Sequence, residues 1–176
     1  MRVNSAGNIV AGPGGALYLA FSDNRNGTHD AASPVTNTNV FLMSSTNGGA
    51  TWSGPSLVDA GAGDQWFPWV EVNPTNGMIG VAYNDRGASN GTLYGAAIAE
   101  GMPGALVKTT VSTAPSNPVE SESFQAEVPG CEECATFHGD YINVSYGSDG
   151  KANIVWTDMS RSTLDGFAQF IGFKRK

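Results

Sequence analysis

The sequence predicts an all-β protein, chiefly because one short strand unit recurs three times along the chain. In each copy a turn glycine precedes an aspartate by eight residues (15 to 23, 77 to 85 and 150 to 158). The copies read GALYLAFSD (15–23), GMIGVAYND (77–85) and GKANIVWTD (150–158). The composition agrees, because 23 glycines, 9 prolines and only 14% charged residues suit short strands joined by tight turns.

Each copy carries apolar side chains on both faces of its strand. The residue two before the aspartate is aromatic and the residue four before it is aliphatic: Phe21, Tyr83 and Trp156, and Leu19, Val81 and Ile154. The residue between them is also small and apolar. This pattern is typical of a strand packed between two neighbouring sheets rather than one with a solvated side.

Further strands flank each copy. A strand precedes the turn, most clearly at residues 69–73 and 141–146, and the turns GPGG, NPTNG and GSDG supply positive φ at low cost. We expect third strands at 39–44, 92–99 and 167–173, and fourth strands at 56–59 and 106–111. The chain therefore divides into antiparallel units at about 7–59, 65–112 and 137–176, with a loop over 113–136.

Repeated four-stranded antiparallel units predict a β-propeller, but a closed propeller needs about four blades or more. Three blades cannot close alone, and the outer ones expose apolar sheet faces. We therefore expect either a truncated propeller or self-association, with two copies forming a six-bladed ring. We expect residues 1–176 to form a single propeller segment.

Charge and cysteine content limit the function classes. The net charge of −7 argues against a nucleic-acid partner, and no apolar run approaches the length that spans a bilayer. Cys131 and Cys134 predict a small disulfide in an oxidising compartment, with a free or redox-active pair as the alternative. With two cysteines and two histidines, the sequence has few candidate ligands for a four-ligand zinc site.

The segment Ser45-Thr-Asn-Gly-Gly-Ala-Thr-Trp52 supplies a more specific signal. It resembles the Asp-box, or BNR repeat, of sialidase-like propellers, with Ser45, Asn47, Gly49, Thr51 and Trp52 at the matching offsets. Asn47 stands where the family has Asp, and a short polar side chain still caps backbone amides there. Gly49 permits the required φ, and Trp52 is expected to fold back over the hairpin.

Most of the rest of the chain resembles the C-terminal half of bacterial, secreted, exo-α-sialidase-like BNR proteins. The stretches that carry this resemblance are residues 21–27, 64–69, 137–142 and 155–158. It implies a secreted or periplasmic protein, although no signal peptide is visible in this sequence. Fold alone does not fix function.

Antiparallel connectivity sorts the loops onto two ends of the units. The end opposite the box turn collects three Asp and Arg pairs just after the repeat strands, together with residues before the first strands: Asp23, Arg25, Asp85, Arg86, Asp158, Arg161, Asp64, Trp66, His138, Asp140 and Tyr141. Three arginines suggest a carboxylate-binding cluster, of the kind that sialidases use for their acidic sugar. The alternative, slightly favoured by the repetition, is that each arginine pairs with its own unit's aspartate and fixes a loop.

The resemblance also implies a tyrosine nucleophile assisted by a carboxylate. Tyr141 beside Asp140 is the best local candidate, although a packed aromatic is the commoner role for a residue at a strand start. The Arg-Ile-Pro motif that opens sialidase catalytic domains is absent.

The sequence therefore predicts recognition of an extracellular glycan or polymer, with exo-sialidase hydrolysis only if further blades contribute. The alternative is a non-catalytic structural or adhesion module. No cofactor is expected; the repeat aspartates could hold calcium, but no run matches a dedicated calcium loop.

Overall fold

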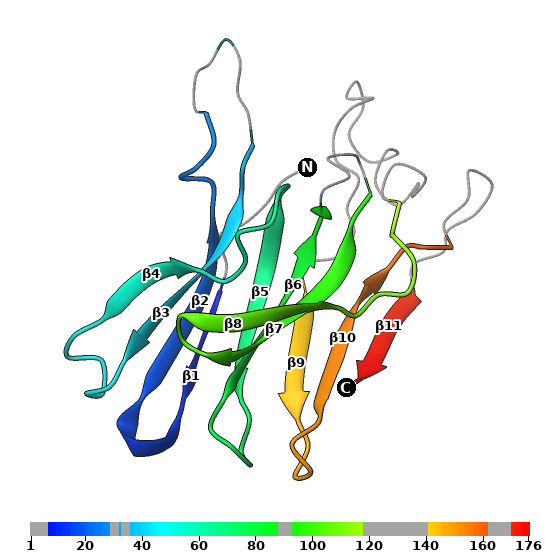
Figure 1. The fold of residues 1–176 in the computed structure, drawn as a ribbon. Helices are drawn as coiled ribbons and strands as arrows, with labels where there is room; N and C mark the ends of the chain where they lie inside the picture. The colour runs from blue at the N-terminus through cyan, green and yellow to red at the C-terminus, as the bar shows by residue number, and fades with distance from the viewer. Residues whose placement is uncertain (1–6, 29–31, 33–35, 88–92, 118–140, 162–169) are drawn as a thin grey trace, which may run out of the picture.

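A computed structural model describes residues 7–28, 32, 36–87, 93–117, 141–161 and 170–176. These residues form eleven β-strands in three antiparallel sheets, which stand side by side in Figure 1. The first sheet contains β1 (Asn8–Ala11), β2 (Leu17–Asp23), β3 (Asn39–Ser45) and β4 (Ser53–Leu57). The middle sheet contains β5 (Gln65–Val72), β6 (Ile79–Asp85), β7 (Gly95–Met102) and β8 (Ala105–Thr110). The third sheet contains β9 (Ile142–Tyr146), β10 (Ala152–Asp158) and β11 (Phe170–Arg175).

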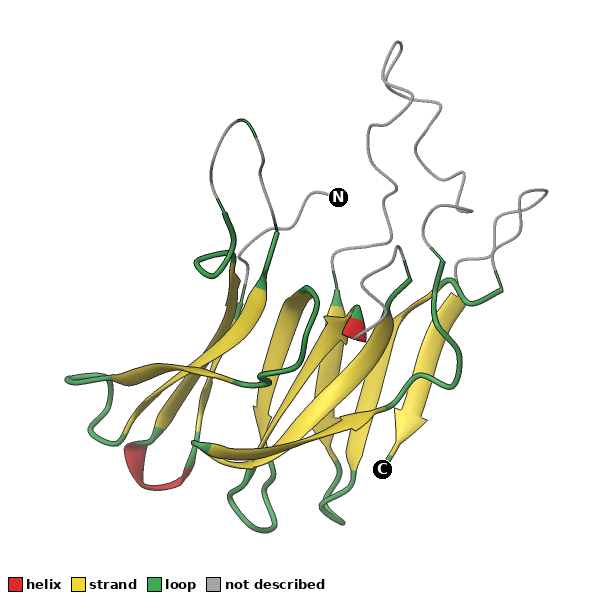
Figure 2. Ribbon diagram, turned by 45° about the horizontal axis from the view of Figure 1, so that its top comes forward, coloured by secondary structure: helices red, strands yellow, loops and turns green. Residues whose placement is uncertain are grey.

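The all-β prediction is therefore confirmed. Figure 2 shows that helix is confined to short turns, such as η1 (Pro13–Gly15). In all three sheets the neighbouring strands are consecutive in the chain, so no sheet of the described residues contains a crossover connection. Within the described part of the chain the sheets form a row and not a closed ring.

The three copies of the repeat are β2, β6 and β10, and each strand ends at its aspartate. Each follows a turn glycine in the left-handed region, with φ of 80° at Gly15, 72° at Gly77 and 75° at Gly150. Side chains rarely adopt this conformation, so the glycine fixes where each hairpin turns.

Several strand boundaries differ from the prediction, and β5, expected at 69–73, spans Gln65–Val72. β7 begins at Gly95 and continues to Met102, because the turn after it keeps Met102 paired with Ala105. β4 lies at Ser53–Leu57, a few residues early, because Asp59 closes a turn by accepting a hydrogen bond from the Gly61 N–H. β11 starts at Phe170, and residues 167–169 lie outside the described residues.

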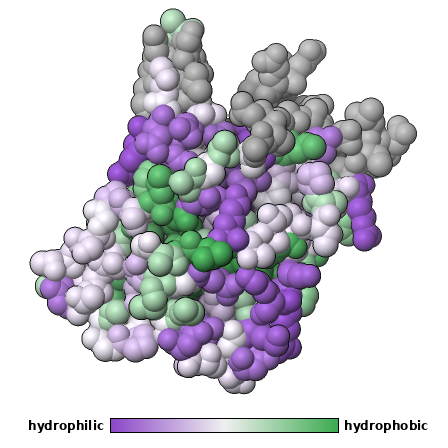
Figure 3. Space-filling view, in the orientation of Figure 1, coloured by the Kyte–Doolittle hydropathy of each residue, from purple (hydrophilic) through white to green (hydrophobic). Residues whose placement is uncertain are grey.

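Two apolar clusters hold the sheets together. One lies between the first and middle sheets and includes Tyr18, Leu42 and Val81; the other lies between the middle and third sheets and includes Ile98 and Ile154. In Figure 3, hydrophobic residues gather in the middle of the visible face and hydrophilic residues line its lower right edge.

Apolar packing on both strand faces is confirmed for the middle sheet only. Every residue of β6 except Asp85 is buried, whereas burial alternates along β2. The middle sheet has a neighbour on each side, while the first sheet has one.

Candidate functional site

The repeated aspartates have the same local role in all three sheets. The Oδ1 atom of each accepts a hydrogen bond from the backbone N–H two residues later. The distances are 2.6 Å for Asp23 with Arg25, 2.9 Å for Asp85 with Gly87 and 2.8 Å for Asp158 with Ser160. This is the turn that Asp side chains commonly form, and it ends each repeat strand. The scaffold interpretation of the repeat therefore has a direct structural basis.

The three arginines have three different partners. Arg25 pairs with its own unit's Asp23 at 2.8 Å and covers the Phe41 ring at 4.5 Å. Arg161 lies 5.5 Å from the centre of the Phe170 ring. Arg25 thus pairs with the aspartate of its own unit. Arg86 and Arg161 have different contacts.

Arg86 pairs with Asp64 rather than with the adjacent Asp85. Its Nη1 atom lies 3.1 Å from the Asp64 carboxylate, and its backbone N–H donates to the Asp64 carbonyl at 3.0 Å. The same carboxylate accepts hydrogen bonds from the Thr36 hydroxyl and the Thr38 N–H, both at 2.9 Å. Asp64 therefore links the segment that precedes β3 to the residue that follows β6. Its side chain is only 10% exposed.

The Trp66 ring packs against the Arg86 guanidinium. The ring lies 5.8 Å from the guanidinium carbon, packs against Tyr94 at 5.5 Å between centroids, and is fully buried. Trp66 precedes an irregularity in the β5–β6 register, where Phe67 adopts a φ of 52°. Such bulges re-aim side chains at the ends of sheets. The Trp66 side chain, expected among the ligand loops, has no exposed surface among the described residues.

A pocket of about 330 Å³ opens beside Arg86 at this end of the middle sheet. Its walls come from the end of β6, the start of β7 and the segment after β8. They include Asp85, Arg86, Gly87, Tyr94, Ser112 and Thr113. Tyr94 is buried, and burial raises the pKa of its phenol, so the ring stays neutral. The sequence placed Asp85 and Arg86 at this end, but not the β8 segment that completes the wall.

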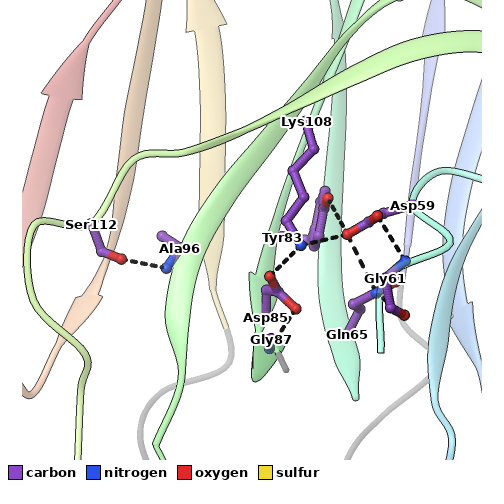
Figure 4. A network of polar contacts seen from close by, with 9 residues as sticks. All are labelled: Asp59, Gly61, Gln65, Tyr83, Asp85, Gly87, Ala96, Lys108 and Ser112. Atoms are coloured by element: carbon purple, nitrogen blue, oxygen red, sulfur yellow. Dashed lines mark hydrogen bonds and ion pairs between the residues drawn. The ribbon is translucent and has the colours of Figure 1, made fainter. Parts of the chain in front are cut away.

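Asp85 has a second role that sequence reasoning missed. The Lys108 ammonium lies 2.5 Å from its carboxylate and 2.6 Å from that of Asp59, so it bridges the first and middle sheets (Figure 4). The Tyr83 hydroxyl donates to Asp59 at 3.2 Å. Lys108 lies in β8 and is 23 residues from Asp85, so only the fold brings the two together.

These contacts shift the pKa values of both partners. Burial raises the pKa of the Asp59 carboxyl, but hydrogen bonds from Lys108 and Gly61 and the Lys108 charge outweigh it, and the pKa lies below its usual value. Burial lowers the pKa of Lys108, but the two carboxylates outweigh it, and the pKa lies above its usual value. Burial, followed by the nearby Asp59 and Asp85 charges, raises the pKa of Tyr83 and keeps its phenol neutral. The network thus holds two carboxylates around one ammonium, which leaves one net negative charge.

The proposed nucleophile is not packed. Tyr141 immediately precedes β9 and is 79% exposed, which corrects the packed-aromatic interpretation. Within the described ranges it makes no side-chain hydrogen bond to a carboxylate. His138, Asp140, Cys131 and Cys134 lie outside the described residues.

The box turn at the opposite end is held by its own side chains. The Ser45 hydroxyl accepts from the Gly49 N–H at 2.9 Å, and the Asn47 side-chain oxygen accepts from the Thr51 N–H at 2.9 Å. Gly49 has a φ of 90°, and a Cβ added there would lie 3.8 Å from the Trp52 ring. The indole therefore folds back over the hairpin. This geometry describes a turn and does not by itself identify a family.

Comparison with known proteins supplies no identity: no protein-family model matches the chain, and no curated protein matches it. Among the described residues, no group of three His, Cys, Asp or Glu side chains is arranged to hold a metal ion. The same residues include no helix of the length and apolarity that a membrane crossing requires.

Proposed function

We propose that this chain is a sialidase-like propeller segment that binds an extracellular carbohydrate in the pocket beside Arg86. The pocket carries the proposal. It combines a volume of about 330 Å³ with Arg86 and Asp85 in its wall, and the Arg86 side chain keeps 24% of its surface exposed. Ligand sites are typically apolar clefts with a few fixed polar groups, and a guanidinium recognises carboxylates and hydroxyls.

The position of Arg86 supports this proposal further. Its pairing with Asp64 and its contact with Trp66 hold the guanidinium in place before any ligand arrives. A fixed donor loses less side-chain entropy on binding than a mobile one. Arg25 and Arg161 contact other rings and are not in the pocket wall.

We propose binding without hydrolysis by the described part of the chain. A tyrosine nucleophile needs a base within hydrogen-bond reach. Tyr141 has no such described partner, and it is not among the residues that line the pocket.

The alternative function is a purely structural or adhesion module. It is favoured by the three Asp turns, because a repeated contact that ends each strand needs no ligand to explain it. In that case the pocket is a by-product of the loop packing.

A glycan array separates these functions. Thr113 is an exposed residue of the pocket wall, so Thr113→Trp should fill the entrance; Thr46→Trp places the same side chain on the exposed box turn as a control. We expect selective glycan binding by the wild type and Thr46→Trp, with at least a tenfold weaker signal for Thr113→Trp. No binding by any of the three proteins would favour the structural module, and equal binding by all three would place the glycan site outside the pocket. Release of the fluorophore from a fluorogenic sialoside by the wild type would show that hydrolysis belongs to this chain.

A further inference from the structure

The first and third sheets each pack one face on the middle sheet and have a second, outward face. Figure 1 places these sheets at opposite ends of the row. Several large apolar side chains on them are exposed: Ile9 55%, Leu57 45%, Val155 37%, Ile171 84% and Phe173 61%. The internal repeat allows each to be compared with a residue at the same position in another sheet.

The third sheet shows the contrast most clearly. Its pair Thr157 and Ile171 corresponds in register to Asn84 and Ala96 of the middle sheet and to Ser22 and Val40 of the first. Ala96 and Val40 are fully buried by the following sheet, whereas Ile171 is 84% exposed.

The next pair along repeats the pattern. Phe173, opposite Val155, corresponds to Ile98 and Leu42. Those two are 0% and 1% exposed, against 61% for Phe173. The outward face of the third sheet is thus the face that packs on a following sheet elsewhere in the chain.

The first sheet shows the complementary face. Ile9, opposite Leu19, corresponds to Val70 opposite Val81 and to Val144 opposite Ile154. Val70 and Val144 are 0% and 1% exposed because they pack on the preceding sheet, whereas Ile9 is 55% exposed. Leu19 and Phe21 extend this apolar face.

We infer that a second copy of this chain covers these faces head to tail, with the third sheet of one copy packed on the first sheet of the other. The contact repeats the sheet-on-sheet packing already present twice within the chain. A heterologous contact of this kind closes when the rotation allows it, and two copies of three sheets are the smallest ring. Burial of Ile9, Ile171 and Phe173 supplies the driving force.

Light scattering tests the inference, because one chain has a mass of 18.3 kDa. We expect the wild type at twice that mass or more. Ile9→Lys and Ile171→Lys should each reduce it to 18.3 kDa, because each places a charge in the contact. Val107→Lys is the matched control, since Val107 is 69% exposed on β8 of the middle sheet. A wild type that stays at 18.3 kDa at all concentrations would overturn the inference.

Mixing the two variants tests the head-to-tail arrangement. An Ile9→Lys copy still has an intact third sheet, and an Ile171→Lys copy still has an intact first sheet. Their mixture should therefore recover one native contact and twice the mass of a single chain. Association that persists in either variant alone, or that fails to return on mixing, would rule the arrangement out. Far-ultraviolet circular dichroism of each variant checks that the sheets remain folded.

Discussion

The Asp85 carboxylate accepts a hydrogen bond from the Gly87 N–H at 2.9 Å, and the same carboxylate contacts the Lys108 ammonium at 2.5 Å. The first contact recurs in the other two sheets, where Asp23 and Asp158 close the same turn. The second contact reaches Lys108 in β8 of the same sheet. A repeated residue thus has a common structural role and, in the middle sheet, an additional contact with the lysine that also binds Asp59 after the first sheet.

Replacement of Asp158 tests the turn role. Asp158→Ala removes the acceptor for the Ser160 N–H and should cost about 1 kcal/mol of unfolding free energy. Asp158→Asn keeps a side-chain oxygen and should cost less than half as much. Urea unfolding of the three proteins measures both values. Equal losses for the two variants would mean that charge, and not the turn hydrogen bond, explains the aspartate.

Replacement of Lys108 tests the bridge between the first and middle sheets. Lys108→Met keeps the aliphatic stem but leaves Asp59 and Asp85 without their shared cation. Hydrogen bonds to charged groups contribute about 1.5–3 kcal/mol, and the 29% exposure of Lys108 places the expected loss at the lower end. Lys151→Met, at an exposed residue, is the control and should unfold like the wild type. A loss no larger than that of the control would show that the bridge adds no stability.

The pH dependence of the same pair follows from the directions of the pKa shifts. Asp59 has a pKa below 3.8 when folded, so its contribution is present above that pH and is lost as the pH falls through the folded value. Lys108 has a pKa above 10.5 when folded, so its contribution is present below that pH and is lost as the pH rises.

The stability difference between wild type and Lys108→Met should therefore stay constant from about pH 5 to 9 and shrink at both extremes. Urea midpoints across the pH range measure it. A difference that persists unchanged at pH values well below 3.8 would refute the assignment of this contribution to Asp59.

Gly80 tests the packing of the middle sheet on the third. A Cβ added at Gly80 would lie 2.1 Å from the Tyr146 hydroxyl oxygen, which donates to Glu100 at 2.8 Å. Gly80→Ala should displace the phenol and cost about 1–3 kcal/mol. Tyr146→Phe removes the hydroxyl, so the double variant should lose about 1 kcal/mol less than the sum of the single losses. Strictly additive losses in urea unfolding would contradict this close approach.

Local patterns predicted the strands well because they depend on neighbouring residues. The turn glycines, the apolar positions of the repeat and the terminal aspartates all lie within nine residues of one another, and β2, β6 and β10 follow them. The three sheets and their order followed from this repetition. Closure into a propeller stays a prediction, since the described residues form a row.

The partners of the charged groups could not be predicted in the same way. Arg86 was expected to pair with the aspartate beside it, but Asp85 already holds Lys108, and Asp64 reaches Arg86 from the preceding connection. Residues separated by 22 or 23 positions leave no spacing signal in one sequence. The packed-aromatic interpretation of Tyr141 is wrong for a related reason: Tyr141 directly precedes β9, where one position decides whether a side chain is packed or exposed. Its role as a nucleophile stays a prediction.

The central claim, that the loop end of the middle sheet binds a carbohydrate, is tested most directly by nuclear magnetic resonance. Labelled protein would be titrated with sialyllactose, and with lactose as the neutral comparison. We predict saturable shifts in the amide signals of Gly87, Gly95 and Ala96 at the pocket, and none at Gly48 and Gly49 in the box turn. Unchanged pocket signals with both sugars, or shifts confined to the box turn, would contradict the claim.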